Sequence, residues 1–428
     1  TGRSLLFPSL SMILKETNGR TLAFAIIALW VAGFAAALIS LGSDKAVALV
    51  ISQPMGRTYS DLRLFPSSRQ EFANGGNPYL ANPSDYWGRT YNYPRLWLSF
   101  MRFPESAVPL IGTALILAWL GGLGAWCGVL TWRQGLAGGL LACSPPVILG
   151  LERGNTDFVI FLLMLLALCA LGRGKANWAW LTILGAFVLK LYPVVALFSF
   201  VRLGWSRAMP RLALGLAACA LYFITFREEL SLAIGNTPKA VLSSYGSTIW
   251  IQVIAYLANK SSDKIYTATP LLLHVKLWAA CLVLVAFTLG WRKTNTAETP
   301  PPDRHLDGFW LGAIIFAATF IVGASYDYRL IFLLLCVPWL WKRDPSGSRD
   351  TLRVKTIASV MLFGCLWLNP HWWFPLIHLR EFCTWSLLIS LGWLLGNTCP
   401  CLPQHWKRYT NLLRLRSPQF AADTTIPR

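Results

Sequence analysis

The residue best suited to acid–base chemistry is a carboxylate in a polar segment that follows the first long apolar run. Asp61 lies within the sequence YSDLR at 59–63, after an apolar run that ends at Leu41. At a boundary between lipid and water, such a carboxylate can remove a proton from an attacking hydroxyl group. The alternative is a solvated loop carboxylate, or one that is paired with Arg57 or Arg63. Weaker candidates in the same polar segment are Asp44, Glu71, Asp85 and Glu105.

Three cations lie in short interruptions between apolar runs, where a charge is costly unless it has a partner. Lys190 interrupts an apolar stretch, Arg153 lies in the turn 152–157, and Arg329 ends the sequence SYDYR. A phosphate or a carboxylate would suit each of them. For Arg329 the alternative is an ion pair with Asp327. Arg63 and His371 are further candidate phosphate ligands, and an interfacial role beside two Trp residues is the alternative for His371.

Aromatic and turn-forming residues occur in the same polar region. GNPY at 76–79 and YNYP at 91–94 carry rings that can stack on a sugar, and anchoring at the membrane interface is the alternative. Asn155 precedes an apolar run, where capping of a helix is the alternative to ligand binding. The residues predicted to bind sugar or acceptor are Tyr59, Asn77, Tyr79, Tyr93, Asn155, Tyr192, Tyr245 and Asp327.

The composition indicates a protein embedded in a membrane. Of the 428 residues, 55% are hydrophobic and 13% are charged, whereas soluble domains carry about 25% charged residues. The net charge of +19 comes from Lys and Arg spread over short loops, which is typical of membrane orientation and not of nucleic-acid binding. The ten cysteines are mostly single and lie in apolar runs, which favours packing over disulfides. Cys399 and Cys401 form a weak metal or redox signal.

Repeated apolar runs predict an all-α polytopic bundle. The runs are Thr21–Leu41, Ala107–Leu130, Gln134–Leu151, Phe158–Leu171, Trp178–Phe200, Ala208–Phe226, Leu271–Gly290, Gly308–Gly323, Leu330–Trp341, Thr356–Leu368 and Phe382–Leu395. The first run is too long for a signal peptide and lacks a small-residue cleavage site. Because the chain begins at Thr1 and not at Met, we expect a short leader or tag to have been removed.

One of these runs contains a break. Lys190 and Pro193 interrupt it, and proline ends or kinks a helix while a charge is costly in hydrocarbon. We therefore predict two short helices, Trp178–Leu189 and Val194–Leu203, that form a hairpin with Lys190 at its tip. The total is then about twelve spanning or partly spanning segments.

Basic residues set the expected orientation. Arg3, Lys15 and Arg20 precede the first span, so the N-terminus is predicted to be cytoplasmic, and twelve segments put both termini on that side. The segments expected on the outer side are 42–106, Glu152–Asp157, Lys190–Pro193, Arg227–Pro270, Ser325–Arg329 and Asn369–Arg380. Most ionisable groups outside the cytoplasmic flanks are therefore expected to converge on one face, as in an active site at a membrane surface.

The predicted organisation is a single transmembrane domain over residues 1–428. Within it, 42–106 is an outer catalytic loop, 227–270 is a second outer loop, and 399–428 is a cytoplasmic tail. The sequence contains no HExxH, P-loop, GxSxG or spaced Cys/His ligand set. The sequence therefore does not support a hydrolase or a nucleotide-driven pump. We expect a reaction without a metal ion or a resident cofactor.

The order of these motifs resembles that of a known enzyme family. A cytoplasmic N-terminus, one span and a long outer loop with an early Asp resemble the integral-membrane glycosyltransferases of the GT-C fold. The order of Asp61, Gly-Asn-Pro-Tyr at 76–79 and Tyr93-Pro94 is similar to glycosyltransferase family 87, the polyprenol-phosphate-mannose-dependent α-mannosyltransferases of bacteria. Arg-Gly-Asn at 153–155, Lys-Leu-Tyr-Pro at 190–193 and Tyr-Asp-Tyr at 326–328 also resemble that family.

The resemblance implies a mechanism and a location. The donor would be a polyprenyl-phosphate sugar that enters from the membrane, and Asp61 would deprotonate a hydroxyl of a lipid-linked or glycan acceptor. That hydroxyl would invert the anomeric carbon, while Lys190, Arg329 or Arg153 stabilises the departing phosphate. Arg95 stands where the family often has a second proline, so the sugar is expected to be mannose or a related hexose or pentose. The site would face outward from a bacterial inner membrane.

Three alternatives to this function stay open on the sequence. A flippase for lipid-linked glycans would require charges at mid-membrane and a repeat between halves. A polysaccharide polymerase or ligase would use a later loop, where 244–250 could border an acceptor or form a surface helix. A non-catalytic assembly subunit is the third. Mutation of Asp61 would separate it from an enzyme.

Overall fold

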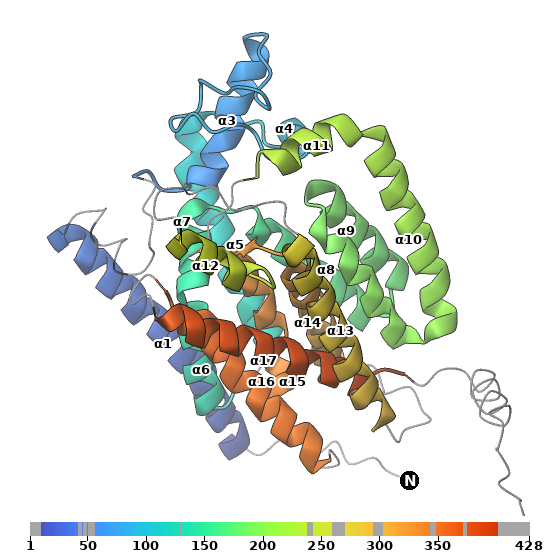
Figure 1. The fold of residues 1–428 in the computed structure, drawn as a ribbon. Coiled ribbons are helices and arrows are strands. Elements are labelled where there is room, and N and C mark those ends of the chain that lie inside the picture. Colours follow the sequence, from blue (N-terminus) through green and yellow to red (C-terminus); the bar gives the residue numbers. More distant parts are fainter. Residues whose placement is uncertain are drawn as a thin grey trace, which may run out of the picture.

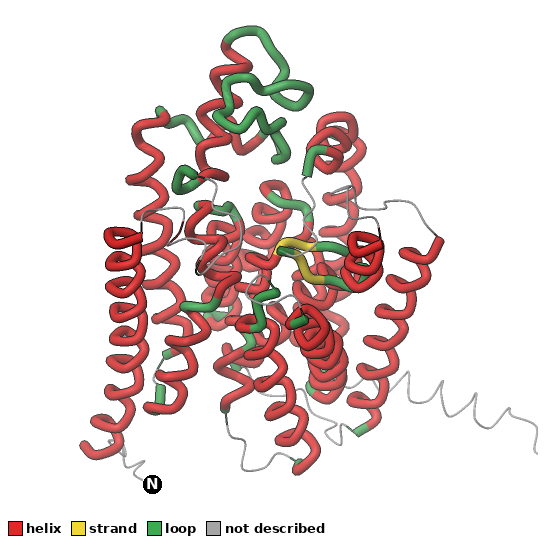
Figure 2. Tube along the Cα trace, turned by 60° about the vertical axis from the view of Figure 1, so that its left-hand side comes forward, coloured by secondary structure: helices red, strands yellow, loops and turns green. Residues whose placement is uncertain are grey.

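The computed structural model describes residues 10–400 except 42–44, 46–48, 50–55, 129, 238–242, 259–269, 294–302, 343–347 and 371–374. The described chain is all-α apart from one pair of two-residue strands (Figure 1). Helix α3 (Ser60–Ala73) projects with its loops from one end of the bundle, which we call the α3 end. Figure 2 shows that loops gather at this end, above the long helices.

Among the residues that the structure describes, five helical segments are long and apolar enough to span a membrane by length and composition. They are Gly19–Leu41 within α1 (Leu10–Leu41), Glu105–Cys127, which covers η1 and α5 (Val108–Cys127), α10 (Trp205–Thr225), α13 (Pro270–Arg292) and α14 (Arg304–Val322). At about 1.5 Å per residue, helices of this length match a hydrocarbon core of about 30 Å. Helices of this length and composition are those of an integral membrane protein, as the sequence predicts.

The remaining described elements are mostly shorter than these helices. They are α4 (Leu96–Phe100), η1 (Glu105–Ala107), α6 (Trp132–Ala142), α7 (Pro145–Arg153), α8 (Asp157–Gly172), α9 (Ala176–Leu189), η2 (Tyr192–Leu203), α11 (Arg227–Gly235), β1 (Ser244–Tyr245), α12 (Ile249–Ala258), β2 (Ser325–Tyr326), η3 (Asp327–Leu335), α15 (Val337–Trp341), α16 (Arg349–Trp367) and α17 (Leu376–Asn397). The two strands pair antiparallel.

Helix breaks bring polar turns to the α3 end. The predicted interruption at Lys190 is confirmed, because α9 ends at Leu189 and η2 begins at Tyr192. The single run expected over 134–151 is bent by 49° between α6 and α7, because Pro145 and Pro146 supply no backbone N–H. Taken together, the two helices are apolar enough for a broken span or a re-entrant loop. The helix expected at Leu330 begins earlier, with the 3₁₀ turns of η3.

Both predicted outer loops contain helices. In the first, α3 buries Phe65 against the rings of Tyr91, Tyr93 and Trp97. In the second, α11 precedes Asn236, whose side chain donates to the backbone oxygens of Tyr79 and Tyr91 at 2.7 and 3.0 Å. The sequence predicted loops here because neither α3 nor α11 is apolar enough to resemble a span. Together they hold the aromatic segments of the first loop in one arrangement.

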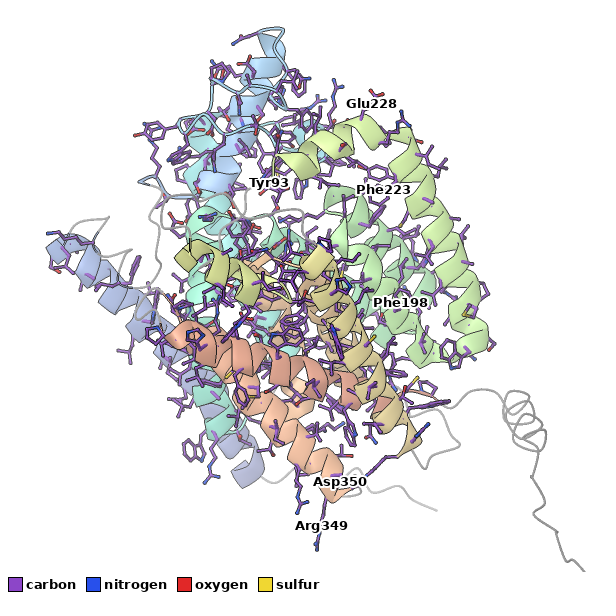
Figure 3. All side chains as sticks on the ribbon, in the orientation of Figure 1. Tyr93, Phe198, Phe223, Glu228, Arg349 and Asp350 are labelled. Atoms are coloured by element: carbon purple, nitrogen blue, oxygen red, sulfur yellow. The ribbon has the colours of Figure 1, made fainter. Side chains whose placement is uncertain are left out.

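Polar groups mark the two ends of the bundle, and apolar side chains lie exposed between them. In Figure 3, Tyr93 and Glu228 lie at the α3 end, and Arg349 and Asp350 lie at the opposite end. Phe198 on η2 lies between these ends, Phe223 on α10 lies near the level of Tyr93, and both are exposed. An exposed apolar belt between polar ends is the surface that a bilayer covers. The most buried of the candidate spans is α14, which packs against η2, η3, α15 and α17.

Helix α1 packs closely against α6 through small residues. A Cβ atom on Gly135 would lie 1.9 Å from the carbonyl oxygen of Gly19, and one on Gly139 would lie 3.1 Å from that of Ala23. Small residues let the backbones of membrane helices approach each other. Figure 1 shows α1 at the edge of the bundle beside α6.

Candidate active site at the α3 end

The start of α3 is held against the end of α7 by backbone contacts. The N–H of Tyr59 donates to the carbonyl of Glu152 at 2.6 Å, and Tyr59 adopts a left-handed conformation with φ 59° and ψ 40°. Gly154 is also left-handed, with φ 59°. A Cβ atom on Gly154 would lie 2.8 Å from Cδ1 of Leu62. A glycine is therefore needed here for α3 to bring Asp61 beside the turn that follows α7.

Replacing Gly154 by Ala is expected to destabilise this contact. The change forces a left-handed alanine, which costs about 1–2 kcal/mol, and it adds a clash with Leu62. Gly174→Ala is the matched control, because Gly174 has φ 71° and no atom lies within 4 Å of its added Cβ. We expect a lower unfolding temperature for Gly154→Ala than for Gly174→Ala in lipid nanodiscs, measured by intrinsic fluorescence. Equal unfolding temperatures would show that the close approach contributes nothing to stability.

Asn155 joins Asp61 to Lys190 at the centre of the site. The side-chain N–H of Asn155 donates to Oδ2 of Asp61 at 2.5 Å, and Nζ of Lys190 donates to Oδ1 of Asn155 at 3.1 Å. Asp61 and Lys190 are each 9% exposed, and Asn155 is fully buried. The sequence predicted both charged residues as candidates, and the structure brings them to opposite ends of one amide.

Arg89 is the charged partner of Asp61 that the sequence did not reveal. Its Nη1 lies 3.5 Å from Oδ1 of Asp61, and its Nη2 donates to the backbone oxygen of Ser60 at 2.7 Å. The same guanidinium binds Asp85 at 3.0 and 3.1 Å. The expectation that Asp61 is a solvated carboxylate, or is paired with Arg57 or Arg63, is therefore wrong. Its partner comes from a loop 28 residues later, and no local spacing predicts that contact.

Asp157 is the fully buried counter-ion of two predicted phosphate ligands. It forms an ion pair with Lys190, accepts a hydrogen bond from the Tyr192 hydroxyl at 2.9 Å, and lies 3.6 Å from Nε of Arg329. Its backbone N–H donates to the side chain of Asn155 at 2.9 Å, but the N-cap residue of α8 is Thr156 and not the predicted Asn155. Two cations therefore share one carboxylate, and the group retains a positive charge.

Aromatic rings enclose these cations. Nζ of Lys190 lies 5.5 Å from the centre of the Tyr93 ring and 5.8 Å from that of Tyr328. The guanidinium of Arg329 lies 5.0 Å from the Tyr192 ring, and such contacts stabilise desolvated cations. Burial and, to a lesser degree, the nearby Asp61 carboxylate raise the pKa of the Tyr93 hydroxyl well above its usual range, so that it stays neutral.

Arg153 lies over the Tyr326 ring and takes no part in the ion pairs of Asp157. Its side chain is 8% exposed and its guanidinium lies 5.6 Å from the centre of the Tyr326 ring. The Nε atom of Arg153 has no hydrogen-bond partner within the part of the chain that the structure describes. A buried donor without a partner is costly, and a ligand oxygen would satisfy it.

The β1–β2 ribbon is fixed by a buried ion pair. Asp327 binds Nη1 of Arg380 at 2.7 Å, and Nη2 of Arg380 donates to the backbone oxygen of Ser244 at 2.6 Å. The alternative in which Asp327 pairs with Arg329 is therefore wrong, because Arg329 points to Asp157 instead. Tyr245 is fully buried and its hydroxyl lies 2.7 Å from that of Thr319. Asp327 and Tyr245 hold the ribbon that carries Arg329 toward the other cations.

The remaining predicted site residues lie in the loop packing around this centre. Arg63 forms an ion pair with Glu105, and the Asn77 side chain accepts from the backbone N–H of Tyr79 at 3.0 Å. The hydroxyl of Tyr79 donates to Tyr93 O at 2.9 Å and to Glu229 at 3.3 Å, and that of Tyr59 lies 3.3 Å from the Thr113 hydroxyl. Burial, followed by the Glu229 carboxylate, raises the pKa of Tyr79. His371 lies outside the described residues.

The residues that the structure brings together form what we call the charged cluster: Asp61, Arg89, Asn155, Asp157, Lys190 and Arg329. Among the described residues, no three His, Cys, Asp or Glu side chains are placed to hold a metal ion. Comparison of the chain with protein-family models, with curated proteins and with solved structures gave no match. The function is therefore inferred from the chemistry of the charged cluster and from the motifs in the sequence.

Proposed function

We propose that the protein is a GT-C-type membrane glycosyltransferase that moves a sugar from a polyprenyl phosphate to an acceptor hydroxyl, with inversion. The observation that carries this proposal is the Asn155 amide, which binds the Asp61 carboxylate on one side and the Lys190 ammonium on the other. A proton acceptor held close to a cation suits a group transfer, because the carboxylate can deprotonate the attacking hydroxyl and the cation can stabilise the leaving phosphate. The order of motifs that resembles glycosyltransferase family 87 supports the same reaction.

Asp61 is the general base in this proposal. Its Oδ2 accepts from Asn155, and its Oδ1 lies 3.5 Å from Arg89, so both oxygens have fixed positions. The carboxylate takes the proton of the acceptor hydroxyl as that oxygen forms a bond to the anomeric carbon. Arg89 orients the carboxylate and is itself held by Asp85.

Lys190 and Arg329 stabilise the leaving phosphate. They carry two positive charges against the single carboxylate of Asp157, so a departing phosphate restores the charge balance. Arg153 adds a buried N–H donor nearby. Preorganised cations of this kind stabilise the charge that develops on a leaving oxygen.

The short helices around the charged cluster suit a donor that arrives through lipid. Neither α9 nor η2 is long enough to cross a bilayer, and Lys190 lies where they meet. Non-spanning helices are tolerated where they line a cavity. We propose that the polyprenyl chain reaches Lys190 from the bilayer, that the α3 end faces outward from a bacterial inner membrane, and that the sugar is mannose or a related hexose or pentose.

The polymerase or ligase alternative draws less support from the structure. It would place the acceptor along 244–250, where Ser244, Tyr245 and Ile249 are buried. A flippase would bind the same lipid without breaking its glycosyl bond. An assay that follows both the bond and the lipid separates these functions.

The test uses the full chain in lipid vesicles supplied with polyprenyl-phosphate mannose, glucose or arabinose, each radiolabelled in the sugar, together with a cell-envelope glycan extract. We expect transfer of label to the glycan and release of free polyprenyl phosphate from at least one donor. Movement of intact labelled lipid across the vesicle without transfer would indicate a flippase. Absence of both from every donor would contradict the proposal.

A further inference from the structure

A polar groove lies beside α3 at the α3 end. Its volume is about 420 Å³, which falls in the range of about 300–1,000 Å³ for small-molecule sites. We call it the basic groove. Among the side chains that line it are Arg57, Arg63, Arg69, Gln70, Tyr86 and Phe103.

Most of the α3 residues that line the basic groove lie on the face of the helix opposite Asp61, whereas Arg69 lies about 80° from Asp61 around the helix. Residues 63, 66, 67 and 70 all line the groove, and this spacing places them along one face of a helix. Asp61 precedes Arg63 by two positions, which is a rotation of about 200° at 3.6 residues per turn. Asp85 also lines the groove and binds Arg89, so the groove reaches the edge of the charged cluster through that ion pair. Asp61 itself does not line the groove.

The groove carries unbalanced positive charge. Arg63 is neutralised by Glu105, and the Asp85 carboxylate is held by Arg89. Arg69 is partly exposed and has no acidic partner among the residues that the structure describes. The guanidinium of Arg57 lies 3.9 Å from the centre of the Tyr86 ring, and both side chains are exposed.

We propose that the basic groove binds an anionic part of the acceptor, a sugar residue that carries a carboxylate or a phosphate. Arg57 and Arg69 supply planar donors that match such groups. Tyr86 and Phe103 supply faces for the apolar side of a sugar ring, and the exposed Gln70 can bind its hydroxyl groups. That the bound glycan is the acceptor rests on the proposed glycosyltransferase function, whereas binding of an anionic glycan in the groove does not.

Direct binding tests the proposal without requiring transfer. The probes are tetragalacturonate, the neutral glycan maltotetraose and inorganic phosphate, titrated against the full chain in nanodiscs of zwitterionic lipid. We expect tetragalacturonate to bind the wild type more tightly than maltotetraose. Arg57→Gln and Arg69→Gln should each weaken tetragalacturonate binding by about tenfold, the effect of one lost charge-assisted contact, and leave maltotetraose binding unchanged.

Two controls make the result specific. Arg102→Gln removes an exposed arginine in the same loop that does not line the groove, so it should leave the affinity unchanged. Asp61→Asn should retain tetragalacturonate binding, so that loss of transfer and loss of binding are separable. Tighter binding of phosphate than of tetragalacturonate would assign the groove to a free anion or a lipid headgroup and overturn the proposal. Equal binding of the charged and neutral glycans, or equal losses in Arg102→Gln and Arg69→Gln, would also overturn it.

Discussion

Replacing Asp61 by Asn is expected to lower the rate of sugar transfer by about 10²–10⁴-fold, the usual contribution of a positioned general base. Asn keeps the size of the side chain, and its oxygen still accepts from Asn155, so the donor should bind with unchanged affinity. The change removes the carboxylate that takes the proton from the acceptor hydroxyl. The measurement is single-turnover transfer from the best donor, with donor affinity determined separately.

Asp85→Asn is the matched control for this substitution. Asp85 is a buried carboxylate that binds the same Arg89 guanidinium, but it makes no contact with Asn155 in the described structure. If Asp61→Asn lowered the rate of transfer only by disturbing Arg89, Asp85→Asn should lower that rate by as much. A wild-type rate of transfer in Asp61→Asn would instead show that another group is the general base.

Replacing Lys190 by Met is expected to lower the rate of transfer by about 10²–10³-fold, as does removal of one preorganised donor from a developing charge. The fold should survive, because Asp157 keeps Arg329 and Tyr192 as partners. We also expect weaker inhibition by the product polyprenyl phosphate, since the variant lacks a cation for it. Product inhibition and single-turnover rate are the two measurements.

The double variant Asp157→Asn, Lys190→Met distinguishes binding of phosphate from a purely structural ion pair. The double variant also removes the buried carboxylate charge that Lys190→Met leaves with only Arg329 and Tyr192 as partners among the described residues. If Lys190 served only to neutralise Asp157, the double variant should regain activity. If Lys190 binds the phosphate, it should stay as inactive as Lys190→Met. Lys355→Met is a further control, because Lys355 is a buried lysine that binds backbone oxygens of Trp339 and Lys342. It lies on α16, which begins at the end of the bundle opposite α3.

The apolar pattern of the sequence was sufficient to predict the long apolar helices α10, α13 and α14 but not the short elements. The runs that became α10, α13 and α14 differ from the described helices by only a few residues at either end. Helix α3 was predicted as a loop, because its apolar side chains pack on other loop residues and form no long apolar run. The bend between α6 and α7 could have been predicted from Pro145 and Pro146.

The polar turns of the candidate site were predictable, and their partners were not. An isolated cation in an apolar run, such as Lys190, indicates by itself that a partner exists. The structure confirms that the turns at 152–157, 190–193 and 325–329 meet. The pairs Asp61 with Arg89 and Asp327 with Arg380 join segments that are distant in sequence. Which carboxylate pairs with which arginine depends on the path of the folded chain, so the spacing of residues within a short motif does not predict these pairs.

The glycine contact between α1 and α6 has a consequence for the order of biosynthesis. Helix α1 leaves the ribosome long before Gly135, so it must reside in lipid without the surface that later covers Gly19. The exposed apolar side chains of its 19–41 segment permit this, because they need no protein partner. The charged cluster is completed later still, when Arg329 is translated. A nascent chain thus carries Asp61 through most of its synthesis before it has the cations that the proposed reaction requires.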